Sequence, residues 1–219
     1  MSYNEDHRDL KDVLSEVRRR GTDNRLIWCK PSLDFQTTVA HREGLLLGGV
    51  RSPLFLRDAG DGLDGIPWVK RLYYPRMVVC ERATGTVADW LPLMEAIAKA
   101  GESLLLVTEQ IAEELLHTLI VNSIKGTLPN AVIYRGNDGS AEALGREWSS
   151  PPEQTDRVPR AAEAWVRRTG TVVFPEPSGG WRGHMQDVEV ISAGGESYDH
   201  QLERLRFLVR EIQTPVRRF

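Results

Sequence analysis

Five histidines could hold a metal ion or act as a general base, and they are scattered along the 219-residue chain: His7, His41, His117, His184 and His200. None belongs to an HExxH motif or another close ligand spacing. His117 lies in an apolar helical pattern, where an exposed or hydrogen-bonded histidine is more common than a base. The carboxylates form no distinctive pair, and no GxSxG motif is present, although members of a Ser-His-Asp triad need not be neighbours. We therefore expect no catalytic residue and no metal site.

The two cysteines, Cys29 and Cys80, lie far apart and lack the CxxC or Cys/His spacing of a metal site. We interpret them as buried thiols in a reducing compartment. Nucleotide binding is not indicated, because the strand-to-helix turns carry neither GxGxxG nor GxxxxGK(S/T). The Gly-Asn-Asp-Gly segment at 136–139 is interpreted as a surface turn rather than as an anion-binding nest. We expect no cofactor.

Charge and hydropathy exclude several partners. The sequence has 28 Lys and Arg against 31 Asp and Glu, a net charge of −3, and 41% apolar residues. This balance lacks the basic excess typical of proteins that bind nucleic acid or an anionic membrane. No apolar run approaches the ~20 residues of a membrane span, and the polar, acidic N-terminus is unlike a signal peptide. We expect a cytoplasmic protein.

The chemistry that the sequence does favour is apolar binding. At about 100° per residue, one helical pattern has an apolar arc of about 160°, made by Val87, Trp90, Leu91, Leu93, Met94, Ile97 and Ala98. A second pattern has one stripe of Ile111, Leu115 and Leu119, another of Leu116, Ile120 and Ile124, and Val121 further round. A helix on a sheet needs only one stripe. The other is either buried by the rest of the fold or exposed as a groove for an extended or helical apolar peptide.

Five segments position these side chains. Apolar runs at 77–80, 104–107 and 131–134 predict strands, and amphipathic patterns at 87–100 and 111–125 predict helices. This βαβαβ order predicts an α/β fold with a central parallel or mixed sheet flanked by helices. Thr86 with Asp89 suggests a capping box, and Gly101 and Gly126 stand where helix C-caps are expected.

The remaining segments are less regular. Gly, Ser, Pro, Asp and Glu dominate residues 136–160, which we interpret as a loop or a loosely attached excursion. Further elements are expected as a helix at 161–168, strands at 171–174 and 187–191, and a turn at Gly179-Gly180. Apolar stripes within 10–17 and 202–212 predict terminal helices that pack together or on the central domain.

Three stretches are similar in sequence to segments of a known family: Trp90-Leu-Pro-Leu-Met-Glu-Ala-Ile-Ala-Lys-Ala-Gly101, Leu104-Leu-Leu-Val-Thr-Glu109 and His117-Thr-Leu-Ile-Val-Asn122. They resemble LPVLEAVAKAG, PLLIIAED and ALATLVVNTMRG of the apical domain of GroEL-type (group I) chaperonins, without gaps from 91 to 126. Upstream, Gly49-Val-Arg-Ser-Pro-Leu-Phe-Leu56 is similar to the family's EGMQFDRGYLSPYFI segment. Weaker similarity covers most of the chain.

The resemblance implies a binding site. In that family, the apical domain binds non-native polypeptide and the co-chaperonin's mobile loop between two helices and along an extended segment beneath them. The residues implied for peptide binding are Val50, Leu54 and Phe55 in the extended segment, Leu91 and Met94 on the first helix, and Leu116, Ile120, Val121 and Asn122 on the second. Two tyrosines of the family's extended segment are apolar here, so two hydroxyls are lost.

The resemblance also implies that this sequence lacks parts of the family's full-length proteins. The chain is too short for the family's equatorial domain and lacks its GDGTT-type motif, so we expect a stand-alone protein without ATPase activity or ring assembly. Another oligomeric state stays open. The expected parts are an N-terminal helical, intermediate-like segment at 1–42, an apical-like domain at 43–195 with a divergent loop at 136–160, and a C-terminal intermediate-like helix at 196–219.

Three functions follow as hypotheses. The leading one is ATP-independent binding of apolar peptide or unfolded polypeptide, as a chaperone-like holdase or minichaperone that assists protein folding. The second is a docking or regulatory module for one partner, such as a chaperonin or co-chaperonin. The third and least favoured is an enzyme that uses the loop at 136–160.

Overall fold

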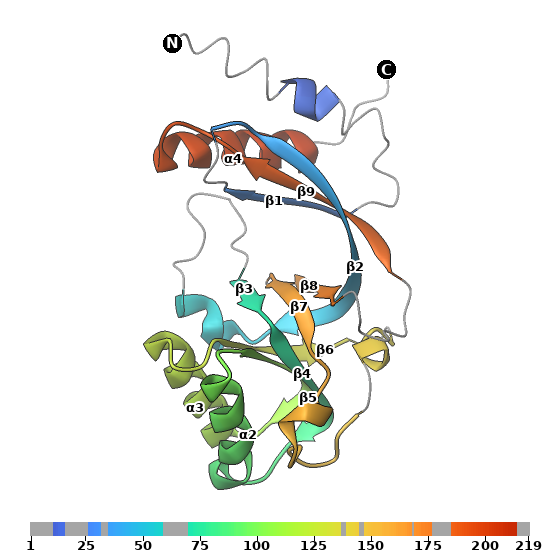
Figure 1. Ribbon diagram of the computed structural model, residues 1–219, viewed down its shortest axis with the longest axis vertical. Coiled ribbons are helices and arrows are strands. Elements are labelled where there is room, and N and C mark those ends of the chain that lie inside the picture. Colours follow the sequence, from blue (N-terminus) through green and yellow to red (C-terminus); the bar gives the residue numbers. More distant parts are fainter. Residues whose placement is uncertain are drawn as a thin grey trace. The chain divides into compact units, whose positions relative to one another are not determined.

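The chain divides into two compact units in a computed structural model (Figure 1). Unit 1 comprises residues 1–43, 63–66 and 186–219, and unit 2 comprises residues 44–62 and 67–185. The structure describes residues 11–15, 26–31, 35–58, 70–136, 139–144, 147–167, 169–176 and 185–213.

Unit 2 is built around three parallel strands and two crossover helices (Figure 1). Strands β4 (Pro75–Ala83), β5 (Ser103–Ile111) and β6 (Asn130–Arg135) are neighbours in a parallel arrangement. Val79 stands opposite Val107, which stands opposite Ile133. Helices α2 (Val87–Lys99) and α3 (Glu113–Lys125) connect the strands. The predicted βαβαβ order and its parallel pairing are confirmed.

Four further strands complete this mixed sheet: β2 (Thr38–Arg51), β3 (Lys70–Tyr73), β7 (Ala161–Val166) and β8 (Thr169–Pro175). Strand β2 pairs antiparallel with β6 and β8, and β7 pairs antiparallel with β8 and β3. The strand predicted at 171–174 is confirmed. The helix predicted at 161–168 is wrong, because pairing with strands on both sides outweighs the helix propensity of its Ala and Glu residues.

The sheet of unit 2 closes on itself at Tyr74. Its strand order is β3-β7-β8-β2-β6-β5-β4, and only Tyr74 separates β3 from β4. Tyr74 has a left-handed φ of 47°, so one bent strand supplies both ends of the order. The Tyr74 and Met77 N–H groups donate to the carbonyl oxygens of Ala162 and Pro159 at 3.1 and 2.9 Å. These bonds join the bent strand to β7 and the residues just before it.

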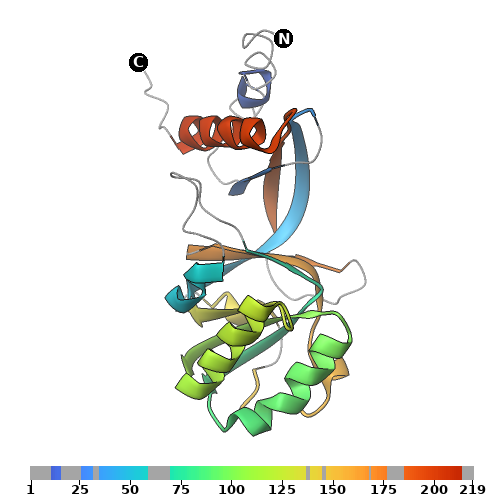
Figure 2. The same cartoon turned by 90° about the vertical axis from the view of Figure 1, so that its left-hand side faces the viewer.

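The closed sheet has an inner and an outer apolar face. Side chains alternate between them along β4, where Met77 and Val79 join the inner cluster and Val78 and Cys80 join the outer one. The inner cluster also contains Leu45, Leu47, Leu72, Leu105, Val107, Ala131, Ile133, Ala164, Val166 and Val173. Helices α2 and α3 cover the outer face of β4, β5 and β6 (Figure 2). Burial on both faces explains why the central strands are continuous apolar runs.

The ends of the helices follow the signals in the sequence. The Asp89 carboxylate accepts hydrogen bonds from the Thr86 N–H at 2.7 Å and the Thr86 hydroxyl at 2.9 Å. These bonds hold the pKa of Asp89 below its ordinary value. Gly126 ends α3 with a left-handed φ of 70°, a conformation that glycine adopts without strain. The predicted capping box and the C-cap at Gly126 are confirmed. The C-cap of α2 is Ala100, and Gly101 follows it with a left-handed φ of 68°.

One buried hydroxyl completes the hydrogen bonding at the ends of β4 and β5. Thr108 is fully buried, and its Oγ1 accepts from the Ala83 N–H at 3.2 Å. The same oxygen lies 3.1 Å and 2.7 Å from the carbonyl oxygens of Glu81 and Gln110, to which the hydroxyl can donate. Thr108 therefore satisfies backbone groups just where both strands lead into their helices.

Residues 139–144 and 147–160 are attached to the sheet, so the prediction of a loosely held excursion is wrong. They include the 3-10 helices η2 (Ala141–Leu144) and η3 (Thr155–Arg157). The Trp148 N–H donates to the carbonyl oxygen of Val79 on β4 at 2.8 Å. Ala141 and Leu144 join the inner cluster, and Val158 joins the outer one. Composition predicted irregular structure correctly, but these contacts involve partners far away in sequence.

Unit 1 combines strands with helices. Strand β1 (Leu26–Pro31) pairs in parallel with β9 (Gln186–Ala193), and β9 also pairs with β2. Helix α4 (Tyr198–Gln213) packs on β1 and β9. The strand predicted at 187–191 and the C-terminal helix are confirmed. Val13 and Leu14, within the helical residues 11–15, pack with Leu205 and Leu208 of α4, as expected of the terminal stripes.

The N-terminal segment 1–42 is not simply helical as predicted. Its described part contains β1 and the beginning of β2, because its apolar residues pair with β9 rather than forming one face of a helix. Strand β9 also places residues from 186 onwards in unit 1. The turn predicted at Gly179-Gly180 lies outside the described residues.

Replacing Thr108 with valine is expected to lower the free energy of unfolding by about 1–3 kcal/mol, because the buried Ala83 N–H loses its acceptor. Denaturant titration followed by circular dichroism measures this change. Thr118→Val is the matched control, since the Thr118 hydroxyl donates to the Glu114 carbonyl at the surface of α3. The control should change stability by less than about 0.5 kcal/mol. Equal effects of the two variants would contradict the role of Thr108.

Candidate peptide-binding site

Helix α3 carries more apolar side chains than its contact with the sheet requires. It lies between α2 and the 3-10 helix η1 (Pro53–Asp58) (Figure 2). Leu115, Leu116 and Leu119 are its buried residues. Val121 and Ile124 are 47% and 63% exposed. The additional stripe seen in the sequence is therefore only partly covered by the rest of the fold.

The two flanks of α3 face different neighbours. Lys70 Nζ lies 5.3 Å from the centre of the Phe55 ring of η1 and donates to Ser123 Oγ at 2.5 Å, so Ser123 marks the flank beside η1. At about 100° per residue, Ile120 lies about 60° from Ser123, whereas Val121 lies about 160° away. Val121 is thus on the α2 flank, and Ile124 lies between Ile120 and Val121 on the solvent side.

Among the described side chains, each neighbouring element exposes a large apolar residue. Leu91 on α2 is 45% exposed and Leu54 on η1 is 48% exposed. The rest of the apolar arc of α2 points inward, and the Trp90 Nε1–H donates to the Thr84 carbonyl oxygen at 3.0 Å. This bond fixes the start of α2 over the sheet.

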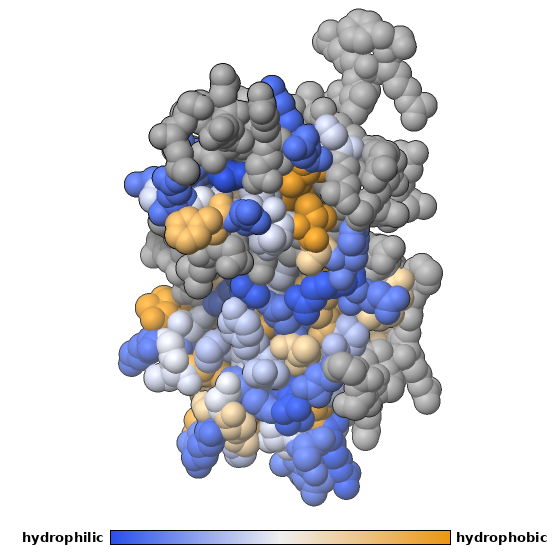
Figure 3. Space-filling view, turned by 45° about the horizontal axis from the view of Figure 1, so that its top comes forward, coloured by the Kyte–Doolittle hydropathy of each residue, from blue (hydrophilic) through white to orange (hydrophobic). Residues whose placement is uncertain are grey.

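We define the helical apolar surface as the side chains of Leu54, Leu91, Ile120, Val121 and Ile124. Ile120 is half-buried and the other four are exposed. On the face that Figure 3 presents, apolar side chains form patches among polar ones. The helical apolar surface draws its exposed apolar residues from three neighbouring elements.

The nine residues implied by the sequence differ in exposure. Val50, Leu54, Leu91 and Val121 are exposed, and Ile120 and Asn122 are half-buried. Phe55, Met94 and Leu116 are only 1%, 4% and 7% exposed and belong to the outer cluster. In this conformation these three residues lie buried beneath the helical apolar surface and are not part of it. Their part in binding, like that of the other six, stays a prediction.

Two of the nine residues, Val50 and Asn122, belong neither to the helical apolar surface nor to the outer cluster. Val50 lies on β2, opposite Tyr134 of β6 and Thr169 of β8. Asn122 uses its amide at the end of α3, where Nδ2 donates to the Thr118 carbonyl oxygen at 2.9 Å. Its Oδ1 accepts from the Thr127 hydroxyl at 2.7 Å. Asn122 therefore stabilises the C-terminal end of α3.

The implied set omits Ile124, which is the most exposed apolar residue of α3. The signal for it was present in the sequence, because Ile124 follows Ile120 by four residues in the same stripe. A resemblance carried over position by position does not include it, whereas the helical periodicity does.

The environment of Cys80 suppresses thiol chemistry. Burial raises the pKa of this thiol to about 11, more than its hydrogen bond with Thr108 lowers it. The thiol is therefore protonated at neutral pH and a poor nucleophile. Within the described ranges, no three His, Cys, Asp or Glu residues are grouped so that they could hold a metal ion. The same residues include no helix with the length and apolar character to cross a membrane.

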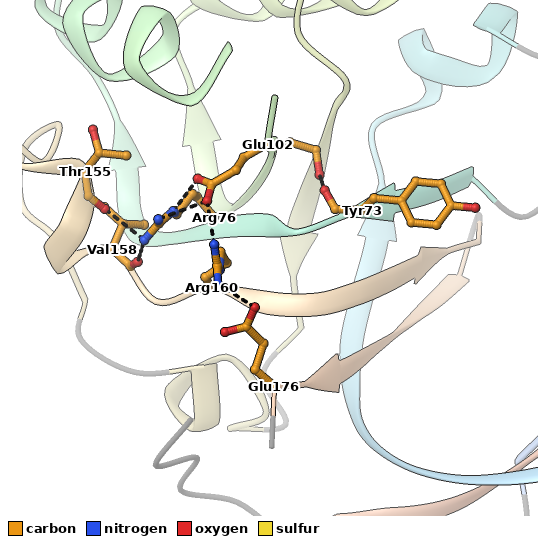
Figure 4. Close-up of polar contacts among 8 residues, drawn as sticks. Tyr73, Arg76, Glu102, Thr155, Val158, Arg160 and Glu176 are labelled. Carbon is orange, nitrogen blue, oxygen red and sulfur yellow. Dashed lines mark hydrogen bonds and ion pairs between the residues drawn. The ribbon is translucent and has the colours of Figure 1, made fainter. Parts of the chain in front are cut away.

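A cluster of ion pairs joins the segment at 155–160 to β4 and β5 (Figure 4). Glu102 accepts hydrogen bonds from Arg76 Nε at 2.6 Å, Arg76 Nη2 at 3.0 Å and Arg160 Nη1 at 3.0 Å. Arg76 Nη1 also donates to the carbonyl oxygens of Thr155 and Val158 at 3.2 and 2.9 Å. The cluster thereby holds Val158 in the outer cluster and η3 against α2.

The charge of Glu102 is maintained by its partners. Its side chain is 8% exposed, and burial by itself raises the pKa of the carboxyl group. The hydrogen bonds from Arg76 and Arg160 outweigh burial and hold the pKa below the ordinary glutamate value. Arg160 is in turn paired with Glu176 at 2.8 Å.

Part of the chain is similar to a known chaperonin. The protein named chaperonin GroEL 5 of Bradyrhizobium diazoefficiens is 39% identical over 117 residues, which is 53% of this chain. The chain spans only 20% of the length of that relative. No family model matches the chain. The protein therefore contains a GroEL-like segment in an α/β fold with a mixed sheet.

The stability of the protein should depend on the ionisation of Glu102. Because the folded-state pKa is depressed, its contribution is present above the unfolded pKa of about 4.3 and is lost as pH falls through the folded value. Glu102→Gln should lower the free energy of unfolding by about 1–3 kcal/mol at pH 7 and flatten its decline below pH 4. Denaturant titrations between pH 3 and 7 measure both effects.

The exposed Glu153 provides the matched control for this experiment. Glu153→Gln should leave both the stability at pH 7 and the acid slope unchanged. If Glu102→Gln and the unaltered protein gave the same stability at every pH, the cluster would not have the role assigned to it.

Proposed function

We propose that unit 2 binds apolar segments of non-native polypeptide on the helical apolar surface, without using a nucleotide. The supporting observation is that α2, α3 and η1 each present a large apolar side chain that is 45–63% exposed. Similarity to a segment of a protein named as a chaperonin supports a chaperonin-related role in general. Binding of apolar segments is the activity that this surface can supply by itself.

Binding through this surface should be weak and tolerant of sequence. Burial of about 300 Å² of apolar peptide surface at roughly 25 cal/mol/Å² contributes about 7 kcal/mol before the costs of ordering. After these costs, dissociation constants in the micromolar range or weaker are expected. Apolar contacts impose few directional requirements, so unrelated apolar segments should compete for the surface. These properties suit a holdase that releases its clients without ATP.

We also propose that unit 2 is apical-like and that unit 1 corresponds to a reduced intermediate domain. The support is the sequence resemblance, which is densest from 91 to 126, within unit 2. We propose the cytoplasm as the protein's compartment, because the two cysteines lack the spacing of a disulfide framework. Cys80 is buried as expected, whereas Cys29 is only half-buried.

A docking module for one partner, such as a chaperonin or co-chaperonin, is the second candidate. The observation that favours it is the burial of Phe55, Met94 and Leu116, which leaves a smaller surface than the resemblance implies. Competition between unrelated apolar peptides separates the two candidates. Mutual competition supports the holdase, whereas binding of one peptide alone supports the docking module.

The combined variant Leu91→Ser, Val121→Ser and Ile124→Ser is expected to bind a fluorescein-labelled apolar peptide at least about tenfold more weakly, because each lost side chain removes buried apolar area. Fluorescence anisotropy measures the affinity. The three residues are exposed, so circular dichroism should show an unchanged fold. Leu116→Ser is unsuitable, since it would introduce a hydroxyl at a buried position.

Phe35 is the matched control, because it is 74% exposed and belongs to unit 1. Phe35→Ser should bind the peptide as the unaltered protein does. An unchanged affinity in the folded triple variant would overturn the proposed function, and so would an equal loss in Phe35→Ser.

A further inference from the structure

The exposed face of α3 changes from acidic to apolar along the helix. Glu113 and Glu114 lie in its first turn, and both side chains are exposed. At about 100° per residue, Glu113 lies within about 20° of Ile120 and Ile124 around the helix axis. Glu114 lies within about 20° of Val121 in the same way. The two carboxylates therefore share the face of α3 that contributes to the helical apolar surface.

These two carboxylates keep most of their negative charge. His117 Nε2 lies 4.0 Å from Glu113 and is charged only when protonated. Among the residues that the structure describes, neither Glu113 nor Glu114 pairs with a lysine or an arginine. The N-terminus of α3 contributes about half a positive elementary charge. With His117 neutral, about one and a half negative charges therefore remain.

The ends of the neighbouring strands do not neutralise this charge. Glu109 and Glu147 both pair with Arg135, at 2.6 and 3.0 Å, and these three groups together have one net negative charge. Glu81 and Arg82 lie 3.7 Å apart and balance each other. The described side chains around the first turn of α3 therefore add to its negative charge.

The opposite end of the helical apolar surface lacks such a negative excess. Since α2 and α3 both connect neighbouring parallel strands, they run in the same direction. Asp89 thus lies at the same end as the first turn of α3, and Lys99 and Lys125 lie at the other end. Glu95, 3.9 Å from Lys99, and the partial negative charges of the two helix C-termini offset these ammonium groups. Within the described residues, only the N-terminal end is acidic.

We infer that the helical apolar surface selects apolar segments that are flanked by a lysine or an arginine, with the cation held near Glu113 and Glu114. The inference rests on the proposed function and specifies its ligand. Seven positions separate Glu114 from Val121, a rise of about 10 Å along α3. About three extended residues span this distance, so the cation lies about three positions from the apolar residue that covers Val121.

Three capped, fluorescein-labelled peptides with one shared six-residue apolar centre test this inference by fluorescence anisotropy. Both flanks of the centre are Lys, Gln or Glu, so the result does not depend on the direction in which the peptide lies. At low salt, the Lys-flanked peptide should bind about threefold more tightly than the Gln-flanked peptide, because exposed charge pairs contribute little each. The Glu-flanked peptide should bind more weakly than both. In 1 M salt, the three affinities should be equal.

Removal of the two carboxylates locates the effect. The double variant Glu113→Gln and Glu114→Gln should lose most of the preference for Lys flanks. It should bind the Gln-flanked peptide as the unaltered protein does, because the apolar side chains are unchanged. The double variant Glu196→Gln and Glu203→Gln is the matched control, since both residues are exposed in unit 1 and the net charge changes equally. This control should keep the original preference.

The outcomes separate this inference from the proposed function. Equal affinities of the three peptides at low salt, or an undiminished preference in the Glu113→Gln and Glu114→Gln variant, would overturn the inference and leave the proposed function standing. An equal loss of preference in the control would do the same, because net charge would then be the cause. Failure of the Gln-flanked peptide to bind at all would overturn both. If sedimentation showed a dimer that the peptides dissociate, a second copy of this chain would be the natural occupant and the inference would be wrong.

Discussion

Closure of the sheet at Tyr74 is the constraint on which the rest of unit 2 depends. Because one bent strand supplies both ends of the strand order, the inner faces of the strands bury one another, with only the short 3-10 helix η2 and no α-helix among the described residues added to their cluster. The two crossover helices are then needed only on the outer face. There α2 and α3 need one apolar stripe each. Leu91, Val121 and Ile124, which lie beyond these stripes, are left at the surface.

Buried polar contacts hold the elements beneath this surface at a few defined points. Thr108 joins the ends of β4 and β5, Glu102 joins both strands to the segment at 155–160, and Lys70 joins β3 to α3. These points lie far apart in sequence, so each closes a long stretch of chain. A surface supported in this way loses little conformational entropy when a ligand binds, which favours even a weak apolar interaction.

Local signals made much of this structure predictable. Apolar runs, helical periodicity and the Thr86–Asp89 capping box identified the βαβαβ unit, because each depends on residues close in sequence. The closure at Tyr74, the strand at Ala161–Val166 and the attachment of Trp148 to β4 were missed, because they depend on distant partners. The same limit applies to the site. Periodicity shows which side of a helix a residue occupies, but not that Met94 and Leu116 are buried there or that Ile124 stays exposed.

Methyl NMR of the full chain during titration with an apolar peptide tests the location of binding most directly. The account predicts that the methyl resonances of Leu91, Val121 and Ile124 shift or broaden with peptide concentration, while those of the inner-cluster residues Leu47 and Leu105 stay unchanged. Shifts confined to unit 1, or no shift at saturating peptide in the folded protein, would contradict the central claim that the helical apolar surface binds polypeptide.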